Sequence, residues 1–144
     1  MTIRCEIVSQ DRTVFTGDVD IVVLPGAAGE MGILPKHAPV LTTLKYGVIK
    51  VRRGGKEEIF TVAGGVAEVQ PDIITVLADA AENVEEIDVA RADAARVRAE
   101  EALKNAPTDT DSYLSIEAAL RKSNLRLDAA RRYRKNTRSP YSEQ

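Results

Sequence analysis

The sequence has almost no cysteine or histidine. Its one cysteine, Cys5, excludes an internal disulfide and a cysteine-based zinc site. His37 is the single histidine, which excludes a multi-histidine metal site. A catalytic pair of Cys5 with His37 stays open on spacing alone. A small cysteine on the apolar face of a strand, however, is usually inert packing.

Long apolar runs and a strong excess of one charge are also missing. No stretch approaches the roughly 18 apolar residues that a membrane-spanning helix needs. A net charge of −2 and a hydrophobic share of 44% favour a globular fold and argue against a nucleic-acid binder. Residues 1–6 lack the apolar core of a secretory signal and the bias of a transit peptide. We therefore expect a chain that begins here and works in a cytoplasm-like compartment.

Glycine is absent after Gly65, and the first part of the chain reads as strands and turns. All nine glycines lie between Gly17 and Gly65. Alternating or β-branched runs, separated by turn residues, predict short strands up to about residue 80. These strands are expected at residues 3–7, 14–15, 19–24, 48–53, 59–63, 66–69 and 73–78, with breaks at Pro25, Gly54-Gly55 and Gly64-Gly65. Such a series is typical of a β-sandwich or a flattened barrel.

From Asp88 onward the sequence changes to alanine, glutamate and arginine, which are good helix formers. Asp88 is suited to be an N-cap. A second helix is expected at residues 111–135, after an interruption at residues 105–109. The first stripe is Ala92, Ala95, Ala99 and Ala102, and the second is Tyr113, Ile116, Leu120, Ser123, Leu127 and Ala130. Two striped helices with a short connection predict an antiparallel hairpin.

The seam of this hairpin is mostly alanine. Burial of one methylene contributes about 0.8 kcal/mol, so an alanine stripe stabilises much less than a leucine stripe. The two helices are therefore expected to be held together weakly, and to open or find other partners at small cost. A hairpin that stays permanently closed on the strand domain is the alternative, and it stays open here.

The glycine-rich segment at residues 25–32 does not fit a nucleotide loop. A Walker loop ends in Gly-Lys-Ser/Thr, whereas Gly32 is followed by Ile33 and Leu34. A dinucleotide fingerprint needs a helix directly after it, which Pro35 and Pro39 prevent. The segment is predicted to be a surface loop with several unusual backbone angles.

The end of the second helix is basic. The cluster consists of Arg131, Arg132, Arg134 and Lys135, with Arg138 a little further on. A run of like charges is usually a solvated face. Docking on an acidic protein surface is the alternative interpretation.

Three motifs resemble a known family. Residues 29–41, Gly-Glu-Met-Gly-Ile-Leu-Pro-Lys-His-Ala-Pro-Val-Leu, resemble the G-E-x-G-I-L-P-x-H-A-P-L-L signature of F-type ATP synthase epsilon subunits. Residues 64–71, Gly-Gly-Val-Ala-Glu-Val-Gln-Pro, look like the family's G-G-x-x-E-V-x-P turn, and residues 74–78 match the strand that follows. The resemblance extends to about Tyr133.

This resemblance implies an α+β fold and a division of labour. A flattened β-sandwich or barrel of about ten strands is expected at residues 1–86, a two-helix antiparallel hairpin at 87–138 and a flexible tail at 139–144. The implied function is that of a non-catalytic rotor subunit, which couples the gamma subunit to the c-ring and restrains ATP hydrolysis through a mobile hairpin. The alpha and beta catalytic subunits are further expected partners. The implied location is the cytoplasmic face of the bacterial plasma membrane, as a peripheral protein.

The resemblance also implies a regulatory ATP site, with no cofactor required. Residues 87–92 are similar to the I/L-D-x-x-R-A motif of epsilon subunits that bind ATP. The implied site residues are Glu82, Ile87, Asp88, Arg91, Arg98, Lys122 and Arg126. Arginines from two helices would bond triphosphate oxygens by forked hydrogen bonds, although Lys122 stands where tight binders carry arginine. Ordinary surface ion pairs, such as Asp88 with Arg91, are the alternative.

Two groups of partner contacts are implied as well. Glu30, Met31 and His37 correspond to the side that faces the c-ring and gamma. Arg131, Arg132, Arg134 and Lys135 lie where relatives offer positive charge to a catalytic beta subunit, and the match there is by location and charge only. Two rival functions stay open: a free-standing ATP-binding sensor protein, and a small enzyme that uses Cys5 and His37.

Overall fold

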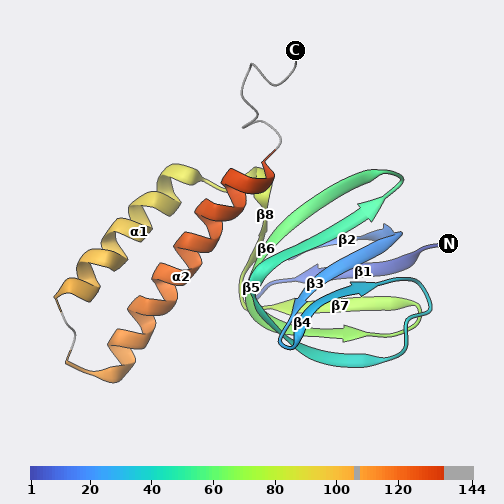
Figure 1. Ribbon diagram of the computed structural model, residues 1–144, viewed down its shortest axis with the longest axis horizontal. Helices are drawn as coiled ribbons and strands as arrows, with labels where there is room; N and C mark the ends of the chain where they lie inside the picture. The colour runs from blue at the N-terminus through green and yellow to red at the C-terminus, as the bar shows by residue number, and fades with distance from the viewer. Residues whose placement is uncertain (106–107, 135–144) are drawn as a thin grey trace, which may run out of the picture. The chain divides into compact units, whose positions relative to one another are not determined.

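The structure is a computed structural model that describes residues 1–105 and 108–134 (Figure 1). The chain forms two compact units, one of residues 1–83 and one that begins at Val84. Each unit is described by itself. The expected tail, together with Lys135 and Arg138, lies outside the described residues.

The first unit is a β-sandwich in which one sheet folds over its own core. Its strands are β1 (Ile3–Val8), β2 (Thr13–Val19), β3 (Ile21–Gly26), β4 (Gly29–Ile33), β5 (Val40–Arg53), β6 (Lys56–Val69), β7 (Ile73–Ala78) and β8 (Ala81–Asn83). The sheet order is β2-β1-β7-β6-β5-β3-β4, with β8 paired to β6. Most neighbours are antiparallel, whereas β1 and β7 run parallel.

Two strands of 14 residues each, β5 and β6, hold the sandwich together. The first half of β6 pairs with β8 and its last residues pair with β7, while β5 follows it along nearly its full length. The expected strand break at Gly64-Gly65 is wrong, because pairing continues through it. The two glycines take φ values of 87° and 134°, which bend the strand without ending it. The described residues therefore carry eight strands rather than about ten.

The core of this unit follows from strict alternation along its strands. Ile3, Cys5 and Ile7 are at most 1% exposed, whereas Arg4 between them faces solvent. The rings of Phe15 and Phe60 pack with centroids 5.5 Å apart. The largest fully buried side chains are Phe60, Ile3, Ile7, Leu24, Ile33, Ile49, Ile74, Val19, Val22, Val62, Val69 and Val76. The expected sandwich with an apolar interior is confirmed.

The glycine-rich segment at residues 25–32 is a hairpin between β3 and β4 rather than the expected loop. Gly26 pairs with Gly29 at its tip, and Gly29 is the residue of this segment with a positive φ, 140°. The expectation of several unusual angles was wrong because strand pairing, not a coiled loop, satisfies this backbone. A Cβ on Gly26 would lie 2.9 Å from the Gly29 backbone oxygen and 2.8 Å from the Met31 sulfur, so a larger residue would force this hairpin tip to shift.

The second unit consists of a short 3₁₀ turn, η1 (Val84–Glu86), and two helices, α1 (Val89–Lys104) and α2 (Thr110–Tyr133). The helices lie side by side and antiparallel (Figure 1). Asp88 is the N-cap of α1, as expected, and accepts a hydrogen bond from the Arg91 N–H at 3.1 Å. Asp109 caps α2 in the same way, from the Ser112 N–H at 2.7 Å.

The seam between the helices is made of small side chains. The buried residues of the two helices are Ala92, Ala99, Ser123, Ala129 and Ala130, of which all but Ala129 lie on the expected stripes. The longer stripe residues Ile116, Leu120 and Leu127 are only half-buried. The first stripe is confirmed in position, and so is the second from Ile116 to Ala130, whereas its expected first residue, Tyr113, is 45% exposed. In the described part of the chain, neither helix has an apolar stretch of the length that crossing a membrane requires.

Candidate functional site

The expected partner loop of the sandwich spans β4 and the turn after it. Glu30 is exposed, whereas Met31 is half-buried and packs against the core. His37 is half-buried in the following turn, where its Nδ1–H donates to the Ala38 carbonyl oxygen at 2.7 Å. Lys36 holds a φ of 67°, and its N–H donates to the Pro71 carbonyl oxygen at 2.8 Å. The turn is therefore fixed to the β6–β7 connection rather than loose.

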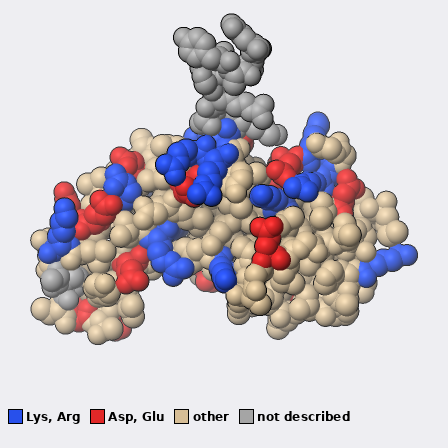
Figure 2. Space-filling model, in the orientation of Figure 1, with Lys and Arg blue, Asp and Glu red and all other residues tan. Residues whose placement is uncertain are grey.

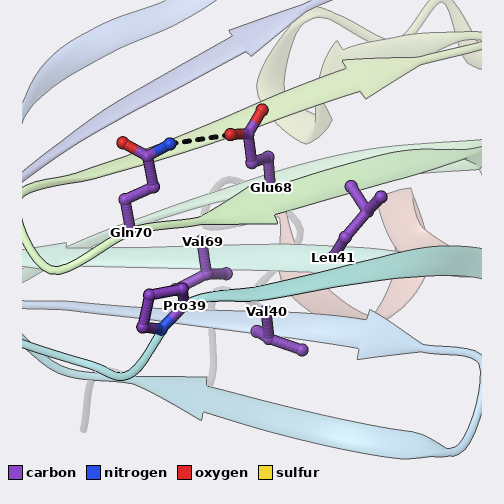
Figure 3. A pocket seen from close by; sticks show the side chains of 6 residues that line it. All are labelled: Pro39, Val40, Leu41, Glu68, Val69 and Gln70. Atoms are coloured by element: carbon purple, nitrogen blue, oxygen red, sulfur yellow. Dashed lines mark hydrogen bonds between the residues drawn. The ribbon is translucent and has the colours of Figure 1, made fainter.

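The two motifs that resemble the epsilon family meet in space. Val40 pairs with Val69 and Leu41 with Glu68, where β5 starts and β6 ends. Around them lies a groove of about 430 Å³ (Figure 3). It is lined by Pro39, Val40, Leu41, Glu68, Val69 and Gln70.

Apolar side chains are exposed on and near this groove. Leu41 is 72% exposed on its wall and Leu34, in the preceding turn, is 58% exposed. Gln70 donates to the Glu68 carboxylate at 2.7 Å, which places a polar pair beside the apolar wall (Figure 3). Sequence reasoning did not select the groove residues, although all six lie within the two motifs. The two leucines thus add exposed apolar area beside the fixed turn.

The pair of Cys5 and His37, which spacing alone left open, is not formed. Cys5 is fully buried in the sandwich core, and burial raises the pKa of its thiol to about 12. No hydrogen bond joins it to His37, which bonds its own neighbour. A thiol that stays protonated is a poor nucleophile, so the small-enzyme hypothesis has no geometric basis. Among residues 1–105 and 108–134 no cluster of metal-binding side chains is found.

The expected ATP residues lie mostly on the second unit. Glu82 is on β8 of the first unit, where its carbonyl oxygen accepts from Thr61 Oγ1 at 3.4 Å. Arg91 lies as many residues before the end of α1 at Lys104 as Ser123 lies after the start of α2 at Thr110. In an antiparallel hairpin, Arg91 and Ser123 are therefore at about the same height along the helix axes. Arg91 therefore lies at the height of Lys122 and Arg126 on the facing helix. Arg98 lies about two turns nearer the tip of the hairpin.

The helical arginines differ in whether they are already paired. Arg96 bonds Asp93 at 2.8 Å and Glu100 at 2.9 Å, and these bonds raise the pKa of its guanidinium. In contrast, no ion pair within the described residues holds the side chains of Arg91, Arg98 and Lys122.

The alternative surface ion pair of Asp88 with Arg91 is not formed within the described residues, where Asp88 accepts the Arg91 backbone N–H instead. On the face drawn in Figure 2, cations and carboxylates are interspersed over the surface, as in ordinary solvated helices. Lys104 of α1, like Arg91, Arg98 and Lys122, has no ion pair within the described residues. Arg91, Arg98 and Lys122 are three of the seven expected ATP residues.

The basic residues at the end of α2 form ion pairs and hydrogen bonds within their own unit. Arg131 and Arg132 bond Asp128 at 2.7 and 3.2 Å, both within the helix. Arg134 follows the helix and donates to the carbonyl oxygens of Glu85 and Ile87. Nothing in the sequence pattern indicated these two bonds.

Family models cover almost the whole chain. Residues 2–84 match the ATP synthase delta/epsilon chain beta-sandwich domain, and residues 85–131 match the long alpha-helix domain of the same chain. Among solved structures, a chain of the Euglena gracilis mitochondrial ATP synthase, in its OSCP/F1/c-ring assembly, is 26% identical with a TM-score of 0.72. The alignment covers 90% of this chain and 81% of that one. A chain of the Tetrahymena thermophila mitochondrial ATP synthase central stalk and c-ring is 13% identical over 90% of this chain and 97% of that one, with a TM-score of 0.58, which shows a shared fold.

Curated relatives agree along nearly the full length. The ATP synthase epsilon chain of Dehalococcoides mccartyi is 44% identical over 134 residues, which is 93% of this chain and 96% of the relative. That of Bordetella parapertussis is 47% identical over 135 residues, 92% of this chain and 95% of the relative. With both domain models matched in order and relatives this similar, the chain belongs to the ATP synthase delta/epsilon chain family.

Proposed function

We propose that this chain is a central-stalk subunit of a proton-translocating F-type ATP synthase, in which the sandwich is the fixed anchor and the hairpin is a brake on ATP hydrolysis. It does not catalyse, because catalysis belongs to other subunits of the complex. The family membership favours this function over a free-standing ATP sensor. The observation that carries the brake is the seam of α1 and α2, whose buried residues are alanines and one serine.

The anchor uses the surface around the β5–β6 groove. Exposed Leu41 and Leu34 supply apolar area, and the fixed turn at Lys36 keeps that area in one shape. Gamma and the c-ring are the partners, with Glu30, Met31 and His37 on the side that faces the polar loops of the ring. The complex lies at the cytoplasmic face of the bacterial plasma membrane, and the chain is peripheral to that membrane through its partners.

The brake depends on how little the seam contributes. Each buried methyl or methylene is worth about 0.8 kcal/mol, so the seam's few alanine methyl groups contribute only a few kcal/mol before the entropy of ordering is subtracted. A hairpin with so small a margin can separate and take a second position among the catalytic subunits. There, Arg131, Arg132, Arg134 and Lys135 offer positive charge to an acidic segment of beta.

ATP is the regulatory ligand in this proposal. Arg91, Arg98 and Lys122 are cations without an ion pair in the described residues, and Arg91 is level with Lys122 and Arg126. Guanidinium groups from both helices would bond triphosphate oxygens, with Ile87 and Asp88 completing the site. ATP would then bridge α1 and α2 and hold the hairpin closed by mass action.

Removal of the hairpin tests the brake. In the assembled complex, deletion of all residues from Asp88 onward is expected to raise ATP hydrolysis several-fold while assembly with gamma and the c-ring is retained. Full-length Leu114→Ala is the matched control, because Leu114 is 55% exposed and lies outside the seam. Unchanged hydrolysis after the deletion would remove the brake from the proposal, and failed assembly would contradict the separate anchor.

Calorimetry tests the ATP site on the isolated full chain. Arg91→Ala is expected to weaken ATP binding at least about tenfold, because it removes a charge-assisted contact. Arg96→Ala is the matched control, since Arg96 carries the same charge on the same helix but is committed to Asp93 and Glu100. Equal losses in the two variants would mean that only net charge matters, and the site would be wrong.

A further inference from the structure

Arg134 joins the two ends of the second unit. It is the C-cap of α2, and its backbone N–H donates to the Ala130 carbonyl oxygen. Its Nη2 donates to the Glu85 carbonyl oxygen at 3.2 Å and also to the Ile87 carbonyl oxygen. These carbonyls belong to the segment that leads from η1 into α1. One side chain from the end of α2 thus holds the backbone just before α1.

Both acceptors are carbonyls at or just after the end of η1. Glu85 lies in η1, a three-residue turn, and Ile87 comes before α1, which begins at Val89. Carbonyls at the end of a helical turn have no partner within it and carry partial negative charge. The Arg134 guanidinium donates a charge-assisted hydrogen bond to each of these two carbonyls, and such bonds are stronger than bonds between neutral groups.

The position of these bonds matters more than their number. The chain itself connects α1 to α2 at residues 105–109, so that end of the hairpin is closed covalently. At the opposite end no covalent link joins the helices, and η1 and the small-residue seam contact α2 there. Ala129 and Ala130 are buried there, 2% and 3% exposed, but they contribute little apolar area. Arg134 therefore acts where the hairpin would begin to open.

We propose that Arg134 is a latch that keeps the helices closed at their open end, and that it must be released before the hairpin can extend. The inference deepens the proposed brake and rests on it for its role in the complex. Arg131 and Arg132 bond Asp128 within α2, so they move with the helix when it opens. Arg134 bonds across the opening and cannot keep these carbonyls while it binds a partner. A partner carboxylate competes with the two carbonyls for the same guanidinium.

Amide hydrogen exchange on the isolated full chain, without nucleotide, tests the latch. The amides of Ala92 and Ala99 report opening of the seam, and those of Val62 and Ile74 report the sandwich. Arg134→Ala is expected to speed exchange at Ala92 and Ala99 about three- to tenfold, from the loss of two charge-assisted bonds. Exchange at Val62 and Ile74 should not change. Arg134→Lys, which keeps the charge without the fork, is expected to fall between wild type and Arg134→Ala.

Arg131→Ala is the matched control, because it removes one positive charge from the same turn. It is expected to leave exchange at Ala92 and Ala99 as in wild type. Equal acceleration in Arg131→Ala and Arg134→Ala would overturn the latch, as would unchanged exchange in Arg134→Ala. If Arg134→Ala loses the helices altogether, an intermediate rate in Arg134→Lys still supports the latch, and a wild-type rate in Arg134→Lys overturns it.

The same measurements separate the latch from the brake. The exchange experiment uses no other subunit, so it does not depend on whether the hairpin inhibits hydrolysis. Faster exchange in Arg134→Ala, together with unchanged hydrolysis after hairpin deletion, would keep the latch and end the brake. The reverse pair of results would keep the brake and end the latch.

Discussion

The two units of this chain bury their residues in different ways. The sandwich interior holds Phe60, Leu24 and a set of isoleucines and valines, each less than 2% exposed. The hairpin buries alanines and Ser123, and its longer side chains are only half-buried. Since apolar burial stabilises in proportion to area, most of the free energy of folding must come from the sandwich.

This difference in burial matches the proposed roles of the two units, in which the sandwich is the fixed anchor and the hairpin is the part that opens. A part that opens easily must be drawn from the low-stability end of a structure. Ser123 is an example of a buried seam residue that does not link the helices. Its hydroxyl donates to the Ala119 carbonyl oxygen at 2.9 Å within α2 rather than across to α1. The seam thus has little apolar area to make it permanent, and the hydroxyl of its buried serine donates within α2.

The largest expected effect is a difference in thiol protection between the two units. Cys5 in the sandwich is compared with Ala99→Cys in the seam, where Ala99 is 6% exposed. Global unfolding costs about 5–15 kcal/mol, whereas local opening can cost far less. Alkylation of the residue-99 thiol is therefore expected to be at least about a thousandfold faster than that of Cys5. Peptide mass spectrometry after timed labelling at pH 8 measures both sites in one sample.

The thiol ionisation of Cys5 needs its own control. Its pKa of about 12 describes the closed sandwich, and the rate at Cys5 reports the open form, in which the thiol is ordinary. A Leu114→Cys variant, at a 55% exposed position, sets the rate of an open helical thiol. Similar protection at residue 99 and Cys5 would mean that the hairpin is as firmly closed as the core, and the proposed brake would lose its basis.

Local patterns predicted the hairpin better than the sandwich. Asp88 as N-cap and the stripe through Ala92 and Ala99 follow from helix periodicity, which is a property of neighbouring residues. The continuity of β6 through Gly64-Gly65 depends on β5 and β7, which pair with it from distant parts of the sequence. A glycine pair reads as a turn unless the partner strand is known.

The candidate sites also differ in how much of them local sequence patterns could predict. The motif residues Leu41 and Glu68 are adjacent only because β5 and β6 pair in one register, so their groove could not be read from either motif alone. The bonds from Arg134 to backbone carbonyls could not be predicted either, because carbonyls carry no sequence signal. In contrast, the face shared by Arg91 and Arg98 follows from their spacing of seven.

An intermediate effect is expected from two glycine substitutions in the sandwich. A Cβ on Gly65 would lie 2.3 Å from the Leu77 carbonyl oxygen, at a φ of 134°. Gly65→Ala is therefore expected to lower the free energy of unfolding by about 3 kcal/mol or more. Gly54→Ala is the control, since its φ of 56° is left-handed but no atom lies within 4 Å, and about 1 kcal/mol is expected. Urea unfolding followed through the sandwich amides measures both, and equal losses would contradict a strand bend that only glycine permits.

The smallest expected effect is the response of the hairpin to acid. Hydrogen bonds from Ser112 hold the pKa of Asp109 below its ordinary value of 3.8. The cap is therefore fully effective above about pH 4, and its contribution is lost as the pH falls through the lowered value. The sandwich core offers no such step, because its buried titratable group in the described residues, Cys5, has a pKa of about 12.

The Ser112 amide proton, followed by NMR from pH 6 to about pH 2, reports this cap directly. In the wild type the chemical shift of this amide proton is expected to change with a midpoint below pH 3.8, because the hydrogen bonds from Ser112 stabilise the ionised Asp109 carboxylate. Asp109→Asn keeps an acceptor oxygen that does not titrate, so its Ser112 amide should stay unchanged over the same range. A wild-type midpoint at or above 3.8 would mean that the bond is not formed in solution. The start of α2 would then lack its cap, and the hairpin would be weaker at its tip as well as along its seam.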